Sequence, residues 1–428
     1  MTTLSPAAGT DRSADVLQSA GSPAVELRCR ECGASYPLSP SHVCELCFGP
    51  LEVGYDPAAL ARVTRTSIEA GPPSMWRYAG LLPAGQDPAT RVDLGSGMTR
   101  LFRAENLARE LGMRSLWVKD DSGNPTHSFK DRVVGVALSA ARAFGFTTVS
   151  CASTGNLANS VAAHAARVGL RAVVLIPSDL EPGKIVMTAV YDQTLIAVDG
   201  SYDDVNRLCA EIAGELPWAF VNVNVRPYYA EGSKTLGYEI AEQLGWRLPQ
   251  QVVVPMASGS LLTKVDKAFG ELGTLGLVEP TDYRVFGAQA SGCAPIATAF
   301  KAGHDVVRPV KPATIAKSLA IGNPADGPYA LDAVRRTGGA MEDVSDEEVV
   351  AGIRLLARTE GVFAETAGGV TVATLQRLLA AGQLDPDAET VLLNTGDGLK
   401  TIDAVSSVVG PSATIAPSLS AFRAAGLA

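Results

Sequence analysis

The sequence predicts an α/β protein whose parallel sheets are covered by helices on both faces. From about residue 100 onward, short runs of β-branched residues alternate with patterns typical of helices. This alternation indicates parallel strands joined by helical crossovers. Strand-like runs occupy 116–120, 147–150, 172–176, 251–254, 283–287 and 391–393. Helical patterns occupy 155–168, 201–213, 233–245, 293–302 and 346–359.

Composition narrows the class of protein further. The chain has 428 residues, a hydrophobic content of 46%, a charged content of 19% and a net charge of −9. These values are typical of a soluble globular protein with two or three core-bearing units. The acidic balance disfavours nucleic acid and anionic membranes as partners. No apolar run is long enough to span a membrane and no secretory signal is evident, so we expect a cytoplasmic protein.

Four cysteines form the clearest local motif of the N-terminal part. They are arranged as two Cys-x-x-Cys pairs within residues 25–55: Cys29, Cys32, Cys44 and Cys47. Four thiolates at this spacing predict a zinc-ribbon-like unit, with a structural zinc ion as a possible ligand. The alternative is a relic that keeps the cysteines without the metal. The segment between the pairs contains no basic residue up to Pro40, so a structural role is favoured over nucleic-acid binding.

The remaining chain divides into a tail, an arm and a body. Residues 1–24 are rich in Ser, Ala, Thr and Gly without periodicity, which predicts a disordered tail. Residues 56–100 predict a connecting arm whose aromatic segment 72–78 packs against the body. The body and its arm together comprise residues 56–428.

The most informative stretch is Asn124–Arg132, which follows a predicted strand and opens a helical pattern. A lysine at this position, Lys130, can project into a cleft at the sheet edge and form a Schiff base with a carbonyl cofactor. A solvated lysine at the start of a helix is the alternative. The segment resembles the lysine motif of fold-type II pyridoxal-phosphate enzymes, and within them the threonine synthase family. His127 stands where that family usually has glycine.

Three further motifs resemble the same family and appear in the expected order. Asn156, after Ser153 and Thr154, matches an asparagine that contacts the cofactor's O3′. Thr395 matches a threonine that faces the pyridine nitrogen. A third loop lies between a strand and a helix, where backbone N–H groups can bind the cofactor phosphate. Its residues are Ser258, Gly259, Ser260 and Leu261.

The resemblance implies a two-lobed fold, with a mobile small lobe at about 145–230, and a homodimer. It also implies conversion of O-phosphohomoserine, an amino-acid phosphate, to threonine and phosphate. The leaving phosphate needs cationic donors, for which Lys184, Arg226 and Lys234 are candidates. His127 either shapes its turn, which we favour, or assists proton transfer or phosphate binding. An arginine that the family places before Ile-Glu-Gly is missing here.

Two other functions remain open from the sequence. One is a sibling β- or γ-replacement or elimination reaction, as in a cysteate-synthase-like enzyme or a threonine dehydratase. A dehydratase acting on threonine would not need a site for an anionic leaving group. The other is a non-enzymatic metal-ribbon binding protein on a degenerate enzyme body, which predicts loss of the lysine that this chain retains as Lys130.

Overall fold

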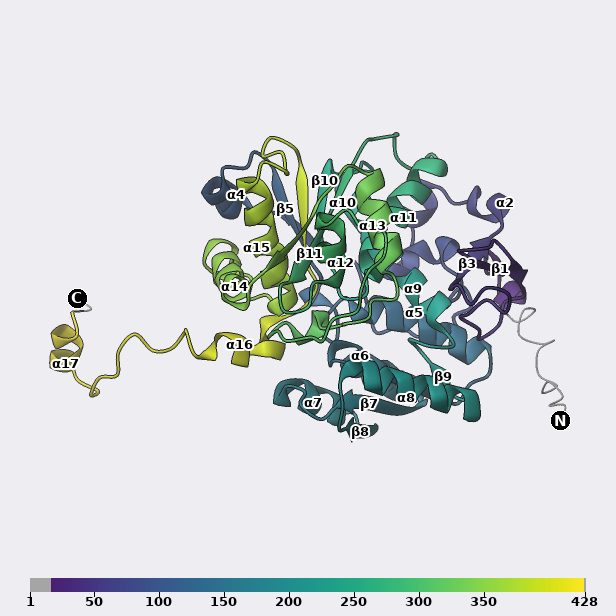
Figure 1. Ribbon diagram of the computed structural model, residues 1–428, viewed down its shortest axis with the longest axis horizontal. Helices are drawn as coiled ribbons and strands as arrows, with labels where there is room; N and C mark the ends of the chain where they lie inside the picture. The colour runs from purple at the N-terminus through teal and green to yellow at the C-terminus, as the bar shows by residue number, and fades with distance from the viewer. Residues whose placement is uncertain (1–16, 427–428) are drawn as a thin grey trace.

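The computed structural model describes residues 17–426, which form three sheets (Figure 1). The predicted tail therefore lies mostly outside the described residues and stays a prediction. The first sheet is the cysteine unit, in the order β2-β1-β3 with antiparallel pairing. Its strands are β1 (Ala24–Cys29), β2 (Ser35–Tyr36) and β3 (Leu51–Tyr55).

The large sheet has the order β12-β11-β10-β13-β5-β4, and its strands are parallel except for β4 at the edge. Its central strands are buried along their whole length because helices cover both faces, as the β-branched runs predicted. The strands are β4 (Arg100–Arg103), β5 (Leu116–Asp120), β10 (Gln251–Pro255), β11 (Arg284–Ala290), β12 (Met341–Val344) and β13 (Thr390–Asn394).

The small sheet has the order β8-β7-β6-β9 and is parallel throughout. It lies below the large sheet in Figure 1 and has its own apolar cluster against α8. Its strands are β6 (Thr148–Ala152), β7 (Arg171–Pro177), β8 (Thr194–Val198) and β9 (Ala219–Phe220). Its helices are α6 (Asn156–Val168), α7 (Pro182–Ala189) and α8 (Tyr202–Glu215).

Most of the other helices surround the large sheet or belong to the arm. In the body they are α4 (Glu105–Leu111), α5 (Lys130–Ala143), α9 (Arg226–Gly232), α10 (Lys234–Gln243), α11 (Ser260–Thr274), α12 (Pro295–Lys301), α13 (Gly327–Arg336), α14 (Asp346–Glu360), α15 (Thr366–Ala380) and α16 (Asp403–Ser406). The last helix, α17 (Leu419–Ala424), lies away from the body at the end of an extended segment (Figure 1). The arm contains α2 (Pro57–Leu60), α3 (Arg65–Glu69) and the 3₁₀ helix η1 (Met75–Leu81). Short 3₁₀ turns are η2 (Asp121–Gly123), η3 (Lys317–Leu319) and η4 (Gly398–Thr401).

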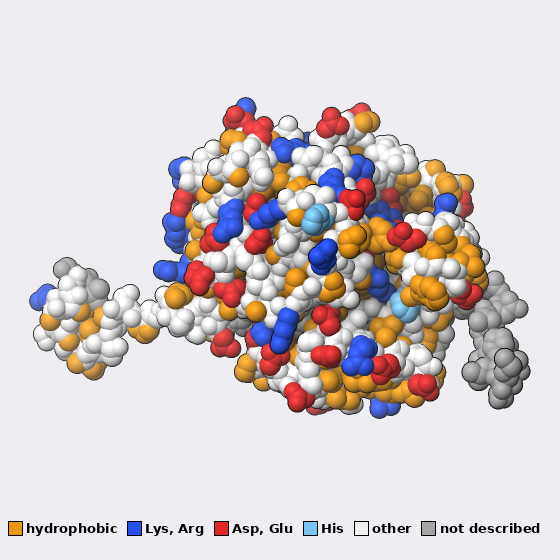
Figure 2. Space-filling view, viewed as in Figure 1, with side chains coloured by type: hydrophobic (Ala, Val, Ile, Leu, Met, Phe, Trp, Pro, Cys, Tyr) orange, Lys and Arg blue, Asp and Glu red, His pale blue; other side chains and the backbone are white. Residues whose placement is uncertain are grey.

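The predicted segments are confirmed to within three residues, and the aromatic arm segment packs into the body through Trp76 and Tyr78, both buried. The sequence pattern missed β4, β8, β9 and β12. β8 is a short apolar run, and periodicity alone does not distinguish such a run from part of a helix. Charged side chains of both signs are interspersed on the face shown in Figure 2. Within residues 17–426, no helix has both the length and the apolar character needed to cross a membrane.

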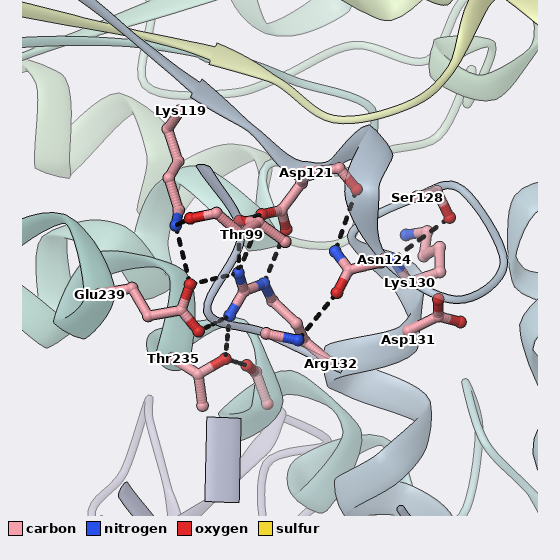
Figure 3. A network of polar contacts seen from close by, with 12 residues as sticks. Thr99, Lys119, Asp121, Asn124, Ser128, Lys130, Asp131, Arg132, Thr235 and Glu239 are labelled. Carbon is pink, nitrogen blue, oxygen red and sulfur yellow. Dashed lines mark hydrogen bonds and ion pairs between the residues drawn. The ribbon is translucent and has the colours of Figure 1, made fainter. Parts of the chain in front are cut away.

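A buried ionic network joins β5, α5 and α10 (Figure 3). The guanidinium of Arg132 donates to Asp121 at 2.7 Å and to Glu239 at 2.6 Å, and the Lys119 ammonium donates to Glu239 at 2.8 Å. All four side chains are fully buried. Burial alone would raise the pKa of Glu239, but Arg132 and Lys119 hold it at about 2. Two basic and two acidic side chains thus pair in the network, and Glu239 stays charged.

Removing one member of this network leaves uncompensated buried charge. We predict that Glu239→Gln lowers the free energy of unfolding by about 3 kcal/mol. The matched control is Glu211→Gln, which breaks an exposed pair with Arg207 on α8 and costs about 0.5 kcal/mol at most. Chemical denaturation of both variants measures the difference. Equal losses in the two variants would show that the network adds nothing specific to stability.

Candidate active site

A cavity of about 320 Å³ opens between the large and the small sheet. Strands β6, β10 and β13 lead into it at their carboxyl ends, where open α/β sheets bind ligands. The four motifs that lie far apart in the sequence meet there. The predicted residues on its wall are Lys130, Ser153, Thr154, Asn156, Arg226, Ser258, Gly259, Ser260, Leu261 and Thr395.

Lys130 is the first residue of α5 and reaches the cavity with its ammonium group. Its Nζ donates to the Tyr229 hydroxyl at 3.0 Å and lies 4.4 Å from the centre of the Phe129 ring. Burial lowers the pKa of Lys130 to about 8, although the negative charge of Glu365 opposes that shift. A neutral amine, which is the nucleophilic form, is therefore accessible near neutral pH.

The loop before Lys130 is fixed by its own side chains. Asp131 accepts hydrogen bonds from the backbone N–H and the hydroxyl of Thr126, both at 2.6 Å, and from the Ser160 hydroxyl at 2.7 Å. Asp131 therefore ties the loop to α6 in the small-sheet lobe. On the other side, Arg132 anchors α5 in the network of Figure 3. The two residues that follow Lys130 are thus held by buried polar contacts, which positions its amine.

Thr395 faces Lys130 from a second loop, at the end of β13. Its carbonyl accepts from the Phe129 N–H at 3.0 Å, and the Asp397 N–H donates to the His127 carbonyl at 3.1 Å. These two bonds hold the lysine loop against the threonine loop. Asp397 is half-buried and caps η4 by accepting from the Leu399 N–H at 2.8 Å.

Asn156 belongs to a buried polar cluster beside the cavity. Its side-chain amide donates to Glu365 at 2.7 Å, and its carbonyl oxygen accepts from Lys400 at 3.0 Å. The neighbouring Gly155 has φ 119°, and a Cβ there would lie 2.2 Å from the stem of Lys184. Glycine is therefore required at this turn both by conformation and by space.

The loop at Ser258–Leu261 has the form of an anion cradle. It ends β10 and opens α11, so free N–H groups of a helix start point toward the cavity. Gly259 has φ 94°, and a Cβ there would lie 3.0 Å from the Asp326 carbonyl oxygen. The Ser258 hydroxyl lies 3.3 Å from the Asp326 carboxylate. Small residues thus leave room for a phosphate group.

Three of the residues considered for phosphate binding lie elsewhere. Lys184 is fully buried and pairs with Glu365 at 3.1 Å and Glu181 at 3.2 Å, outside the cavity lining. Lys234 is also buried and pairs with Glu231 at 2.7 Å. His127 is exposed and does not line the cavity. Among the three cationic candidates, Arg226 is the one that lines the cavity, and its guanidinium donates to Asp326 at 2.8 Å.

Sequence reasoning missed several residues of this site. Tyr229 is the hydrogen-bond partner of Lys130, and Lys400 contacts Asn156 beside the cavity, but neither residue was predicted. His42, from the cysteine unit, also lines the cavity, and its pKa is lowered by burial and by the positive charge of Arg226. No local signal marks these residues, because each acquires its place through tertiary contacts.

The four cysteines meet at one point of the N-terminal unit. Their sulfur atoms all lie within 4.8 Å of one another, with Cys29 and Cys47 at 3.4 Å and Cys32 and Cys44 at 3.6 Å. A tetrahedral zinc site with bonds of about 2.3 Å requires sulfur separations of about 3.8 Å. The donor set and its size therefore fit a structural zinc ion.

A family model and solved structures define the broad class of protein to which the chain belongs. The family described as "Pyridoxal-phosphate dependent enzyme" matches residues 92–396, which include Lys130, Asn156, the 258–261 loop and Thr395. The solved structure of diaminopropionate ammonia lyase from Escherichia coli superimposes with a TM-score of 0.63 at 21% identity, over 74% of this chain and 88% of that one. Maize serine racemase gives a TM-score of 0.58 at 20% identity, over 70% and 88%. These likenesses establish the fold.

Curated relatives then narrow the family. A threonine synthase from Methanocaldococcus jannaschii is 38% identical over 88% of this chain and 93% of its own length. One from Methanosarcina acetivorans is 35% identical over 93% and 98%, and one from Mycobacterium tuberculosis 36% over 76% and 88%. The chain therefore belongs to the threonine synthase family of pyridoxal-phosphate-dependent enzymes.

The backbone conformation of His127 explains why the threonine synthase family is expected to have glycine at this position. Its φ is 60°, a left-handed conformation that costs a non-glycine residue about 1 kcal/mol. We predict that His127→Gly keeps kcat/KM within about twofold and raises the free energy of unfolding by about 0.5 kcal/mol. His127→Ala, which removes the imidazole but keeps the strain, should keep the activity without the gain. A loss of tenfold or more in both variants would assign the imidazole a chemical role.

The lowered pKa of Lys130 predicts how the protein takes up its cofactor. Because the neutral amine is the reactive form, the rate of pyridoxal-phosphate incorporation into cofactor-free protein should rise with pH and level off above about 8. Stopped-flow visible absorbance measures this rate, and Lys130→Ala should show no such absorbance. A rate that keeps rising toward pH 10 would mean that the amine is not desolvated.

Proposed function

We propose that this protein converts O-phospho-L-homoserine and water to L-threonine and phosphate, with pyridoxal phosphate bound at Lys130. The observation that carries the proposal is the meeting of Lys130, Asn156, the 258–261 loop and Thr395 around one cavity. Similarity to curated threonine synthases over most of the chain supports the same reaction.

The residues present fit the cofactor. In this proposal Lys130 would hold its carbonyl carbon, and Asn156 would contact O3′. Its phosphate would be held through backbone and hydroxyl donors of Ser258, Gly259, Ser260 and Leu261. A hydroxyl from Thr395 would leave the ring nitrogen largely unprotonated, which would moderate electron withdrawal. When bound, pyridoxal phosphate stabilises negative charge at the carbons next to the substrate's amino group.

Lys130 then serves as the acid and base of the reaction. Its amine lies in the cavity, where it would move the protons at Cα, Cβ and Cγ of the substrate. Its lowered pKa lets it accept and return protons near neutral pH. Tyr229 holds the amine by the hydrogen bond described above. The Cγ–O bond breaks with phosphate as the leaving group, and water adds its hydroxyl at Cβ.

The substrate contacts, the movement of the small lobe, the cellular location and the oligomeric state are also proposed. Ser153, Thr154 and Arg226 line the cavity on the small-sheet side and are proposed substrate contacts. Movement of the lobe at 145–230 would open the cavity to the substrate. The net charge of −9 supports a protein that acts on small molecules in the cytoplasm rather than on nucleic acid or membranes. A homodimer is proposed from the family resemblance alone.

The test is turnover of O-phospho-L-homoserine by the cofactor-loaded protein. We predict phosphate and L-threonine in equal amounts, measured in parallel, and no turnover by Lys130→Ala. Threonine and serine should yield oxo acids at least a hundredfold more slowly. Rapid deamination of threonine with no phosphate release from O-phosphohomoserine would instead assign a dehydratase-type reaction.

A further inference from the structure

The cysteine unit contributes a residue to the reaction cavity. His42 lies between the two cysteine pairs, two residues before Cys44, and its half-buried side chain lines the cavity together with Arg226. Within residues 17–426 the imidazole of His42 has no hydrogen-bond partner. A unit built only as a clip would not need to place an unpaired donor on the wall of an active site.

The unit is fixed to the elements that carry this side of the cavity. The Tyr228 hydroxyl of α9 donates to the Ser39 carbonyl at 3.1 Å, and Arg30 stacks 3.6 Å over the ring of Tyr329 on α13. Glu52 on β3 accepts from Lys264 on α11 at 2.6 Å. These three helices begin at or next to the cavity residues Arg226, Asp326 and Ser260. The position of His42 is therefore defined relative to the site.

The charges around Arg226 explain why a bound phosphate group would need a second hydrogen-bond donor. Arg226 carries five N–H donors and, among the described residues, pairs with the carboxylate of Asp326 at 2.8 Å. That pair is close to neutral, and Asp203 adds another carboxylate to the lining. A phosphate dianion would gain little from Arg226 alone in such surroundings. His42 faces the same space and supplies a further N–H donor.

The cysteine site in turn sets where His42 lies. The His42 carbonyl accepts from the Leu51 N–H at 2.9 Å, and the Cys44 N–H donates to the Gly49 carbonyl at 2.8 Å, so the loop is closed around the second cysteine pair. A metal ion at the four cysteines would cross-link the two pairs, and its binding energy would stabilise the folded unit. Loss of the ion would therefore loosen the segment that carries His42.

Resting on the proposed function, we propose that His42 is a substrate-binding residue which, with Arg226, binds the leaving phosphate, and that a metal ion at the four cysteines holds it in place. The cysteine unit is then part of the substrate site. Because a hydrogen bond to a charged group is worth about 1.5–3 kcal/mol, loss of His42 should weaken phosphate binding roughly ten- to a hundredfold.

The first experiment compares His42→Ala, His42→Gln and Val43→Ala in the cofactor-loaded, metal-loaded protein. Val43 is the exposed neighbour of His42 in the same loop and does not line the cavity, so its variant is the matched control. For His42→Ala we expect KM for O-phosphohomoserine to rise at least tenfold, with kcat changed less than threefold. Inhibition by inorganic phosphate should weaken in the same ratio. Glutamine, which keeps an N–H donor, should recover part of both.

Binding of L-homoserine, which lacks the phosphate, separates this role from general damage. Its dissociation constant, followed by the visible spectrum of the bound cofactor, should stay within twofold in all three variants. Calorimetric titration of the cofactor-loaded protein with inorganic phosphate gives a readout that needs no turnover. KM and phosphate affinity equal to wild type in His42→Ala would overturn the assignment. Should His42→Ala not fold, His42→Gln decides on the same two readouts.

The second experiment removes the metal with a chelator and measures the zinc content per chain. Metal-free wild type should bind phosphate as weakly as His42→Ala, with its cofactor absorbance unchanged. His42→Ala should lose nothing further, because coupled changes are not additive. Unchanged phosphate affinity in metal-free wild type would overturn the coupling. Phosphate binding that depends on His42 in a protein unable to turn over O-phosphohomoserine would keep this site and refute the proposed function.

Discussion

The pairing of Arg132 with Glu239 and Asp121 is the constraint on which the site depends. It buries a guanidinium between β5, α5 and α10, and such a charge is tolerated only with complete pairing. The same pairing fixes the first turn of α5. Lys130 lies two residues before Arg132, and Asp131 holds the preceding loop through hydrogen bonds. The position of the reactive amine is therefore set by polar contacts on both sides.

The protein has several buried lysines, and their partners decide which one is chemically available. Lys119, Lys184 and Lys234 each contact a carboxylate within 3.2 Å, so their ammonium groups are engaged in ion pairs. Lys130 instead donates to a phenol, and its pKa falls to about 8. The pKa of Lys400 also falls to about 8 through burial, but its ammonium is held by the side-chain oxygens of Asn156 and Asn159 away from the cavity lining. Only Lys130 combines a reactive amine with access to the cavity, among the described lysines.

Much of this arrangement could be predicted from the sequence because its signals are local. Gly155 and Gly259 mark strand-to-helix turns, and both adopt the positive φ that glycine permits. Lys184 could not be placed in this way, because its partner Glu365 is distant in the sequence and takes up its charge inside the fold. The position of His42 at the cavity could not be predicted either, because it depends on how the cysteine unit packs against the body. Local chemistry thus predicted which loops meet at the cavity, whereas tertiary pairing decided which cations line it.

The central claim, that this cavity replaces a phosphate at Cγ by a hydroxyl at Cβ, is tested most directly by isotope labelling. Turnover of O-phospho-L-homoserine in ¹⁸O-water should yield L-threonine carrying ¹⁸O in its hydroxyl group, measured by mass spectrometry. The released phosphate should carry none, because the Cγ–O bond is the one that breaks. Label in the phosphate, with homoserine as the other product, would mean cleavage of the P–O bond and would contradict the account.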